Sequence, residues 1–565
     1  MAWRTACPDW EDRIVAGLPL VPDLPLFEDQ AAKALRIFKR LRVPDIIGTP
    51  TYGEACGKWV FDFVRALFGS YDQAAQRRMI REFFLMIPKK NGKSSIAAAL
   101  MVTAAIMNRR PEAELLLIAP TKKIAEIAFK QASGIIRLDP ELSKIFHPQT
   151  HQRTITHRIS LAMIAIKAAD ADVITGSKAT YILIDETHVF AKKSKAADIF
   201  VEIRGSLAAR PDGFMLQITT QSKDPPSGVF KDELSIARQV RAGELDLPLL
   251  PVLYELPVGL TKDGGWQDPK TWGMVNPNLN RSVDEAFLRD ELTKAKTGGA
   301  EKLALLASQH FNVEIGIGQH GDRWRGVDYW LGAAIEGLTL DELLARSEVV
   351  VAGIDGGGLD DLLGLAVIGR DRETRDWLLW NHAWGHSEVY ELREEIVPKL
   401  RDLEKEGTFT LCDHATQDIL EVADVIERLH QSGLLPEANG VGFDPFGVAA
   451  MVDELAARGV HTAEHGGPVV AVSQGFRLSS AVWGMERKLK DGTFWHCGQD
   501  LMTWCVGNAK VEQKGNAVLI TKETAGKAKI DPLIATFNAF TLMARNPEAS
   551  SGNLDSFIAS LGAAS

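Results

Sequence analysis

The sequence lacks the features that mark exported, membrane-spanning or zinc-binding proteins. No run of about 18 uncharged apolar residues is present, so we expect no membrane-spanning helix. The first twelve residues are polar and acidic, which is unlike an export signal. Cysteines are few and lack metal-ligand spacing: Cys7, Cys56, Cys412, Cys497 and Cys505. An odd number of scattered cysteines is typical of a reducing compartment, so we predict a cytoplasmic protein.

The chain also lacks an excess of positive charge. Its 64 Lys and Arg residues face 74 Asp and Glu residues, for a formal net charge of −10. Binding to duplex nucleic acid rests on cations that neutralise phosphates, so DNA contact would need a local basic face. A hydrophobic content of 45% with 24% charged residues is that of a folded chain, and a length of 565 residues predicts two or three domains.

The N-terminal half has the pattern of an α/β domain. Residues up to about 80 are mostly helical in periodicity. Beyond them, short apolar runs alternate with helix-length segments such as Ser95–Met107 and Lys122–Ile136. The apolar runs are Phe83–Ile87, Leu115–Ala119, Leu161–Ile166, Tyr181–Ile184 and Met215–Thr220. Buried strands alternating with helices predict a parallel-rich sheet that is covered on both faces.

A candidate phosphate loop follows the first of these strands. It reads Pro88-Lys89-Lys90-Asn91-Gly92-Lys93-Ser94-Ser95 and precedes an Ala-rich helix, with Ile87 where the full motif has its first glycine. Backbone N–H groups near Gly92 can close on phosphate oxygens, Lys93 can reach the β and γ phosphates, and Ser94 can bind Mg²⁺. Because Gly-Lys-Ser also occurs in ordinary surface turns, its place between a strand and a helix is what favours ATP binding. We assign all eight residues to the ATP site.

Acidic and hydroxyl side chains end two later strands of this half. Asp185 and Glu186 follow an apolar run, an arrangement in which one acid holds Mg²⁺ through water and the next acts as general base on the attacking water. The alternative is a strand that ends in a charged turn. Thr219 and Thr220 end a neighbouring run, where we predict a role in coupling hydrolysis to motion, although a Thr-rich strand end is also ordinary.

A second α/β unit is predicted in the C-terminal half. Three closely spaced runs predict an antiparallel meander: Val349–Ile354, Leu363–Ile368 and Trp377–Trp380. Helix, strand, helix and strand are expected next, over His386–Lys405, Thr408–Cys412, Asp418–Ser432 and Val441–Asp444. The predicted domains are a helical lead-in (1–75), an ATPase core (76–255), a connecting subdomain (256–345), a nuclease (346–545) and a flexible tail (546–565).

Three acids mark element ends in this unit. Asp355 ends the first strand, Asp444 ends a later strand and Asp531 opens an apolar helix. This is the ribonuclease-H-like arrangement, in which carboxylates hold two divalent metals about 3.5–4 Å apart for attack of water on a phosphodiester. Oxygen ligands favour Mg²⁺ or Mn²⁺. Singly, each acid has a structural alternative, such as a helix cap for Asp531, and Asp361 and Asp413 remain open as further metal ligands.

The sequence resembles the large terminase subunit of tailed double-stranded DNA bacteriophages, over about residues 59–544. In the N-terminal half the resemblance rests on Pro88–Ser95, Gly176-Ser177, Tyr181–His188, and Trp272 with Asn276-Pro277-Asn278. In the C-terminal half it rests on Gly353-Ile354-Asp355, Asp361, Phe443-Asp444-Pro445, Gln474-Gly475, His496 with Trp504, and Lys529-Ile530-Asp531.

The resemblance implies ATP-driven movement of viral DNA through a portal into procapsids, and metal-dependent cleavage of concatemers. It implies ATP with Mg²⁺ and two nuclease metals as cofactors, with double-stranded DNA, the portal of the procapsid and a small terminase subunit as partners. It further implies a homo-oligomeric ring, expected to be a pentamer, in the host cytoplasm and transiently at the portal vertex. The resemblance implies that the catalytic residues are Glu186, Asp355, Asp444 and Asp531.

One departure and several alternatives stand beside this resemblance. Family members often carry Pro-Trp-Gln with an adenine-reading Gln, where this chain has Lys58-Trp59-Val60. The arginine finger has four candidates, Arg153, Arg158, Arg204 and Arg210. A host-type ATP-dependent helicase-nuclease, a ribonuclease-H-like transposase or integrase with a fused ATPase, and a nucleotide-binding capsid scaffold are the alternative functions.

Overall fold

The computed structural model divides the chain into two compact units, Met1–Ile315 and Gly316–Ser565. The structure describes residues 3–168, 179–193, 195–262, 264–315, 323–444, 449–515, 517–522 and 529–550. Within these ranges, no helix has the length and apolar character needed to cross a bilayer. Gly176-Ser177, Pro445 and residues 551–565 of the expected tail lie outside them.

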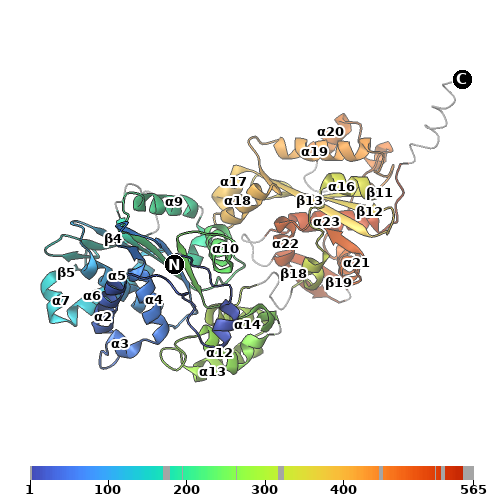
Figure 1. Ribbon diagram of the computed structural model, residues 1–565. Coiled ribbons are helices and arrows are strands. Elements are labelled where there is room, and N and C mark those ends of the chain that lie inside the picture. Colours follow the sequence, from blue (N-terminus) through green and yellow to red (C-terminus); the bar gives the residue numbers. More distant parts are fainter. Residues whose placement is uncertain are drawn as a thin grey trace. The chain divides into compact units, whose positions relative to one another are not determined.

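The first unit is built on an eight-stranded sheet with the order β10-β3-β9-β8-β4-β7-β6-β5. Strands β4 and β5 of this sheet are labelled in Figure 1. Neighbouring strands from β10 to β7 are parallel, and β6 and β5 extend the sheet in antiparallel fashion. The strands are β3 (Glu82–Met86), β4 (Glu114–Ala119), β5 (Phe146–Gln149), β6 (Thr154–His157), β7 (Met163–Ala168), β8 (Ala179–Asp185), β9 (Phe214–Thr219) and β10 (Leu249–Leu253). The predicted parallel-rich sheet is confirmed.

Alternate strand residues enter two different cores, so helices cover both faces of this sheet. Phe83 and Leu85 of β3 pack with α2, α4, α5 and α6, whereas Phe84 and Met86 pack with α10. This is the period-2 alternation of a strand that is buried on both faces. The helices are α2 (Glu28–Arg40), α4 (Lys58–Gly69), α5 (Lys93–Met107), α6 (Lys122–Arg137), α9 (Ala196–Leu207) and α10 (Gly228–Ala242).

The ends of the first unit are helical. The lead-in contains α1 (Trp10–Val15) and α3 (Tyr52–Ala55) beside α2 and α4, with a small β1–β2 ladder (Tyr71–Asp72 and Arg77–Arg78). After β10 come α11 (Val258–Lys262), α12 (Pro269–Val275), α13 (Glu285–Thr297) and α14 (Ala300–Phe311). Trp272, Val275 and Phe311 belong to the same core as α4 and α5, so these later helices complete the first unit.

The second unit is built on a seven-stranded mixed sheet. Its order is β14-β13-β12-β11-β15-β16, with β17 also paired to β13. Strands β11, β12 and β13 form the predicted antiparallel meander. Strand β15 pairs with β11 in parallel. The strands are β11 (Ser347–Gly356), β12 (Leu363–Asp371), β13 (Trp377–Gly385), β14 (Phe409–Leu411), β15 (Val441–Phe443), β16 (Val469–Ala471) and β17 (Phe494–His496).

Helices also cover both faces of the second sheet. One layer contains α15 (Val327–Trp330), α21 (Ser479–Lys490), α22 (Asp500–Gly507) and α23 (Asp531–Met543). The other layer contains α16 (Leu340–Arg346), α19 (Gln417–Gln431) and α20 (Ala449–Ala457). A hairpin of β18 (Ala509–Lys514) and β19 (Ala517–Lys522) stands apart from the sheet. The expectation of two α/β units is confirmed.

Some elements differ from the sequence prediction for local reasons. The single helix expected over His386–Lys405 is two helices, α17 (Ser387–Leu392) and α18 (Val397–Glu406), with Pro398 in the first turn of the second. Proline favours the start of a helix and disfavours its interior. Strand β10 was not among the predicted strands, and it includes Pro251. It forms the edge of the sheet, where a missing N–H is tolerated.

Candidate functional site

The phosphate loop connects β3 to α5 at the carboxyl end of the parallel strands. Gly92 caps α5 with φ of 78°, and Lys90 also lies in the left-handed region with φ of 70°. Left-handed backbone suits glycine and is costly for lysine, so surrounding contacts must hold the loop in this conformation. The end of β3 is tied to its neighbour because Ile87 N donates to Thr219 O at 3.0 Å.

Lys93 lies in the interior with its ammonium group directed at this site. Its Nζ is 3.5 Å from Ile87 O and 4.0 Å from Glu186 Oε1. Burial lowers the pKa of Lys93, and the Glu186 and Asp185 carboxylates oppose that shift. A buried lysine next to two acids and a helix N-terminus suits the binding of a polyanion.

Ser94 and Asp185 come together as the sequence predicted for a Mg²⁺ site. The Ser94 hydroxyl donates to Asp185 Oδ2 at 3.4 Å. Asp185 Oδ1 is buried and has no hydrogen-bond partner among the residues that the structure describes. Burial, aided by the adjacent Glu186 carboxylate, raises the pKa of Asp185 to about 7. An unsatisfied buried carboxylate oxygen beside a hydroxyl fits a hydrated hard cation, which supplies the missing donors and positive charge.

Glu186 has an unusual backbone conformation and a partner that the sequence analysis did not identify. Its φ is 58°, in the left-handed region that a non-glycine residue rarely adopts. His188 Nδ1 lies 3.2 Å from Glu186 Oε2 and 3.1 Å from Thr219 Oγ1, and His188 N donates to the same hydroxyl at 3.0 Å. The predicted base and the predicted coupling residue are therefore joined through one buried imidazole. Thr220 is fully buried beside them.

Val60 stands where the resemblance leads to the expectation of a glutamine. Val60 is fully buried in the core of the first unit, so its side chain does not face a nucleotide. The neighbouring Trp59 donates its indole N–H to Asn278 Oδ1 at 2.9 Å. Asn278 belongs to the segment of Trp272 and Asn276-Pro277-Asn278, and it also donates hydrogen bonds to Asn91 of the phosphate loop.

Two of the predicted nuclease acids end neighbouring parallel strands. Ile354 of β11 pairs with Phe443 of β15, so Asp355 and Asp444 follow at the same edge of the sheet. Gly353 and Gly442 face helix α23, because a Cβ atom at either would contact that helix. Side chains two residues apart share a face of a strand. Asp355 and Asp444 therefore lie on the face that α23 covers.

The third acid approaches the same corner from α23. A Cβ atom at Gly364 would lie 2.6 Å from Pro532 N and 2.8 Å from Asp531 C, so the first turn of α23 touches β12 directly. A Cβ atom at Gly356, next to Asp355, would lie 3.3 Å from Asp531 Cβ. Three acids distant in sequence thus reach one corner of the sheet. Among the described residues, no three acidic, histidine or cysteine side chains are close enough to form a finished metal centre.

Nearby polar groups hold this corner in place. Asn538 of α23 donates to Ile354 O at 3.0 Å, and Gln474 donates to Asn538 Oδ1 at 2.9 Å. Lys529 is buried and its Nζ contacts the Asp361 carboxylate and, at 3.3 Å, Asp360 O. The oxygen-only set of Asp355, Asp444 and Asp531 is of the kind that binds Mg²⁺ or Mn²⁺.

Asp413, which the sequence left open as a ligand, lies elsewhere. It follows β14, and β13 and β12 separate β14 from β11. Strands are spaced about 4.8 Å apart, so three spacings put Asp413 roughly 14 Å from the Asp355 strand. Asp413 is also exposed. Asp444, on a direct neighbour of β11, is the acid that the sheet order favours.

The arginine-finger candidates differ in the ion pairs that each forms within the subunit. Arg204 is held between Glu82 and Glu233, at 2.9 and 2.8 Å, and these carboxylates raise its pKa. Arg153 pairs with Glu126 at 2.6 Å. Arg158 is exposed near His147. Arg204 therefore has a structural role in the first unit.

His496 also has a structural role. Its ring stacks on Trp330 with centroids 3.9 Å apart and an interplanar angle of 10°, and Nε2 is 2.7 Å from Trp330 O. Gly498 N donates to Nδ1, so Nε2 carries the proton. Burial lowers the pKa of His496 to about 4. The ring is thus neutral at physiological pH and fully engaged in hydrogen bonds.

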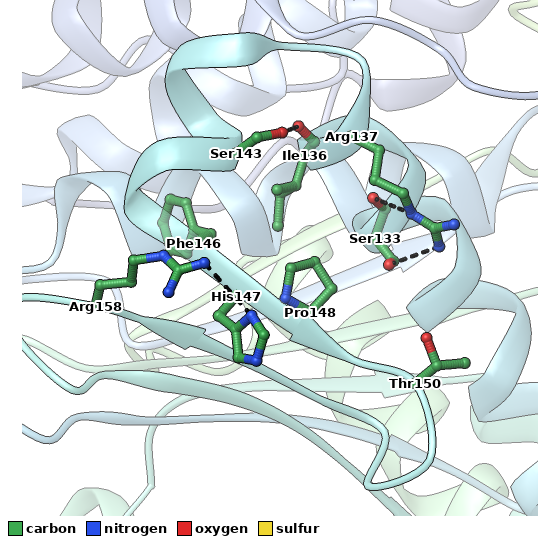
Figure 2. Close-up of a pocket in the computed structure, with 9 residues that line it drawn as sticks. All are labelled: Ser133, Ile136, Arg137, Ser143, Phe146, His147, Pro148, Thr150 and Arg158. Atoms are coloured by element: carbon green, nitrogen blue, oxygen red, sulfur yellow. Dashed lines mark hydrogen bonds between the residues drawn. The ribbon is translucent and has the colours of Figure 1, made fainter.

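A cavity of about 350 Å³ lies at the far edge of the first sheet (Figure 2). It is bounded by α6, by the short helix α7 (Pro140–Ile145) and by β5. Arg158, one of the arginine-finger candidates, lines it, but none of the predicted ATP-site or nuclease residues does. Arg137 donates to the main chain and hydroxyl of Ser133 at 3.3 and 2.8 Å, and Arg158 lies 3.5 Å from His147 Nδ1. The cavity is separate from the phosphate loop.

Comparison with known proteins gives two family models that match consecutive parts of the chain. Residues 59–239 match the model described as "Terminase large subunit, ATPase domain", and residues 257–547 match "Terminase large subunit, endonuclease domain". The second match begins at the helices that the structure assigns to the first unit, about 60 residues before the compact second unit.

The individual proteins that resemble this chain share low sequence identity with it. Protein YmfN of Escherichia coli (strain K12) is 21% identical over 378 residues, which are 64% of this chain and 77% of that protein. The crystal structure of the HK97 bacteriophage large terminase is 18% identical, covers 90% of this chain and 99% of its own, and gives a TM-score of 0.47. The large terminase nuclease from thermophilic phage G20c with bound magnesium is 12% identical, covers 39% and 95%, and gives 0.25.

Proposed function

Because this chain belongs to the terminase large subunits, with an ATPase domain followed by an endonuclease domain, we propose that it drives viral double-stranded DNA through a portal into procapsids. Its two enzymatic activities are ATP hydrolysis and DNA cleavage. The observation that carries the proposal is the pair of family matches, which together run from residue 59 to residue 547 with one short gap. The clustering of Lys93, Ser94 and Asp185–Glu186 supports it.

The ATP site is assigned to residues of the phosphate loop and of the β8 end. The loop backbone from Pro88 to Gly92 and the Lys93 ammonium bind the phosphates of ATP. Ser94 and Asp185 would hold Mg²⁺, which would supply positive charge to the phosphates during phosphoryl transfer. Ser95 follows at the start of α5, where its hydroxyl is 2.7 Å from Tyr52 Oη.

Glu186 is the general base of ATP hydrolysis in this proposal. It accepts the proton of the water that attacks the γ phosphate. His188 orients the carboxylate together with Lys93, since its Nδ1 contacts Oε2 whereas Lys93 Nζ lies near Oε1. Thr219 contacts the same imidazole and, with Thr220, reports the state of the site to neighbouring strands.

The nuclease site is assigned to Asp355, Asp444 and Asp531. These carboxylates would hold two divalent metals, which would supply an activated water and positive charge for hydrolysis of the phosphodiester. The hydrogen bond from Asn538 to Ile354 O fixes the backbone next to Asp355. Lys529, two residues before Asp531, pairs with the Asp361 carboxylate.

DNA and the packaging machinery are the partners that family membership implies. We propose in particular the portal of the procapsid, a small terminase subunit that recognises the packaging site, and a ring of copies of this chain, expected to be a pentamer. Such a protein acts in the host cytoplasm and transiently at the portal vertex. A helicase-nuclease would need a second RecA-like sheet, whereas the second sheet here begins with an antiparallel meander.

Packaging into purified procapsids tests the proposal. Wild-type protein should package DNA with ATP, and Lys93→Ala should not, because the phosphates lose their buried cation. Asp355→Ala should lose cleavage but still move DNA with pre-cut ends. Translocation by Lys93→Ala at the wild-type rate would contradict the ATP assignment, and wild-type cleavage by Asp355→Ala with Mg²⁺ or Mn²⁺ would contradict the nuclease assignment.

A further inference from the structure

Three buried asparagines join the phosphate loop to the connection between α12 and α13. Asn91, Asn276 and Asn278 are exposed by only 0%, 1% and 5%. Asn91 Nδ2 donates to Asn276 Oδ1 at 2.8 Å, Asn278 N donates to Asn91 Oδ1 at 3.2 Å, and Asn278 Nδ2 donates to Asn91 O at 2.9 Å. We call this group the asparagine clasp. It links residues more than 180 positions apart.

Two further contacts fix the clasp to its surroundings. Trp59 Nε1 donates to Asn278 Oδ1 at 2.9 Å, so both polar atoms of that amide are engaged. Ser282 Oγ donates to Lys90 O at 2.7 Å. Lys90 is the lysine with left-handed backbone, a conformation that persists only where other contacts hold it. The α12–α13 connection thus supplies the contacts that the strained loop needs.

Helix α14 meets the same loop. Lys89 N donates to Gln309 O at 2.8 Å, and Asn276 Nδ2 donates to His310 O at 3.0 Å. Both carbonyls lie in the last turn of α14, a few residues before the second unit begins at Gly316. The loop is therefore held from two directions by the helices that follow β10.

Opening the loop would leave several buried amide groups without partners, which is costly in a low-dielectric interior. The clasp makes no use of the Lys93 ammonium or the Ser94 hydroxyl. Its hydrogen bonds therefore keep the loop shaped for phosphate without occupying the groups that are assigned to ATP and Mg²⁺. A loop that is already ordered loses less entropy when its ligand binds.

We propose that Asn276 and Asn278 are positioning residues for ATP binding, which hold the phosphate loop in its nucleotide-receiving conformation through Asn91. The proposal rests on the proposed function, because it takes the loop to be the ATP site. When the clasp is broken, only part of the population has a competent loop, and the apparent dissociation constant rises by the inverse of that fraction. Hydrolysis in the bound state proceeds as before, because Glu186 and His188 are untouched.

The test measures binding of a fluorescent ATP analogue and the kcat and KM of ATP hydrolysis for the full-length chain. For Asn278→Ala we expect a dissociation constant and a KM about tenfold higher, with kcat within about twofold of wild type. Asn108→Ala is the matched control, because its partly buried amide also donates to a main-chain carbonyl, Arg110 O at 2.7 Å, but outside the clasp. It should bind ATP as wild type does.

Ser282→Ala keeps the proposal testable if Asn278→Ala does not fold. Ser282 is exposed, and its loss frees only Lys90 O, so we expect a folded protein with about threefold weaker ATP binding. Wild-type affinity in both Asn278→Ala and Ser282→Ala, or in Ser282→Ala alone where the other is unfolded, would overturn the proposal. A loss of kcat without a change in KM would overturn it too.

Lys93→Ala, measured in parallel, separates this proposal from the proposed function. If Lys93→Ala fails to bind the analogue while Asn278→Ala binds normally, the ATP site stands and the clasp has no role in binding. If Lys93→Ala binds the analogue as wild type does, the assignment of the ATP site itself is wrong.

Discussion

His188 Nδ1 lies 3.2 Å from Glu186 Oε2, whereas Lys93 Nζ lies 4.0 Å from the other carboxylate oxygen, Oε1. The two residues are separated by one position in sequence, and Glu186 takes a left-handed backbone conformation at the end of β8. His188 also contacts Thr219 at the end of the neighbouring strand. The predicted base of ATP hydrolysis and the predicted coupling strand therefore share one buried imidazole.

His188→Ala should slow ATP hydrolysis without weakening ATP binding. The Glu186 carboxylate remains but loses the group that orients it, so we expect kcat to fall about tenfold, less than for loss of the base itself. His157→Ala is the control, because that partly buried imidazole accepts from Ser160, away from the site. Steady-state ATPase assays with a separate binding measurement check this. An unchanged kcat would show that His188 does not position the base.

Asp355→Asn and Asp444→Asn should each abolish DNA cleavage, whereas Asp413→Asn should not. Loss of a direct metal ligand should cost at least the roughly 100-fold that outer-shell changes can cost. Asp413 ends a strand three places from β11, so its carboxylate is too distant to share a metal with Asp355. Plasmid nicking with Mn²⁺ measures all three variants. Equal losses in the Asp413 and Asp444 variants would contradict the sheet order as the guide to the ligands.

Asp185→Asn should stabilise the metal-free, nucleotide-free protein at pH 8. Burial raises the pKa of Asp185 from 3.8 to about 7, so the folded state is increasingly penalised as the pH rises from about 4, where the unfolded carboxyl ionises, and the penalty is complete above pH 7. As the pH falls from 7 towards 4, the folded state takes up the proton and the penalty disappears. We expect a gain of about 1 kcal/mol at pH 8, or roughly 2 °C in Tm.

Thermal melts from pH 8 to pH 5 test this sign, and the difference between variant and wild type should shrink as the pH falls. Added Mg²⁺ and ATP should stabilise the wild type more than the variant, because binding then favours the charged carboxylate. If the variant is less stable than wild type at pH 8 without Mg²⁺, the buried Asp185 carboxylate does not destabilise the fold, which would contradict this prediction.

Gly353→Ala should disturb the second unit at the corner of its sheet that Asp355, Asp444 and Asp531 reach. A Cβ atom there would lie 2.0 Å from Ala535 O and 2.5 Å from Ala539 N, so α23 must move away from β11. We expect a loss of about 3 kcal/mol in the free energy of unfolding, and weaker Mn²⁺ binding because Asp531 moves with α23. At Gly332 a Cβ atom meets nothing within 4 Å, so Gly332→Ala is the control. Calorimetry and Mn²⁺ titration measure both.

Local patterns in the sequence were sufficient to predict the main strands and to propose the residues of the ATP site. A phosphate loop and an acid-ended strand are written in consecutive residues, because the chemistry of each depends on one turn and its flanking elements. The same holds for the antiparallel meander of the second unit, whose strands follow one another closely. Very short strands such as β16 and β17, and an edge strand with an internal proline such as β10, gave too little pattern to be predicted.

The neighbours of each element were decided only by the tertiary structure. Sequence alone left Asp413 beside Asp444 as a candidate ligand, and the sheet order separated them by placing β15 next to β11 and β14 at the opposite edge. The contacts of His188 with Thr219, and of Asn91 with Asn276 and Asn278, are hydrogen bonds between distant segments. Sequence fixes which groups a segment can offer, whereas packing of the buried strands and helices decides which of those groups meet.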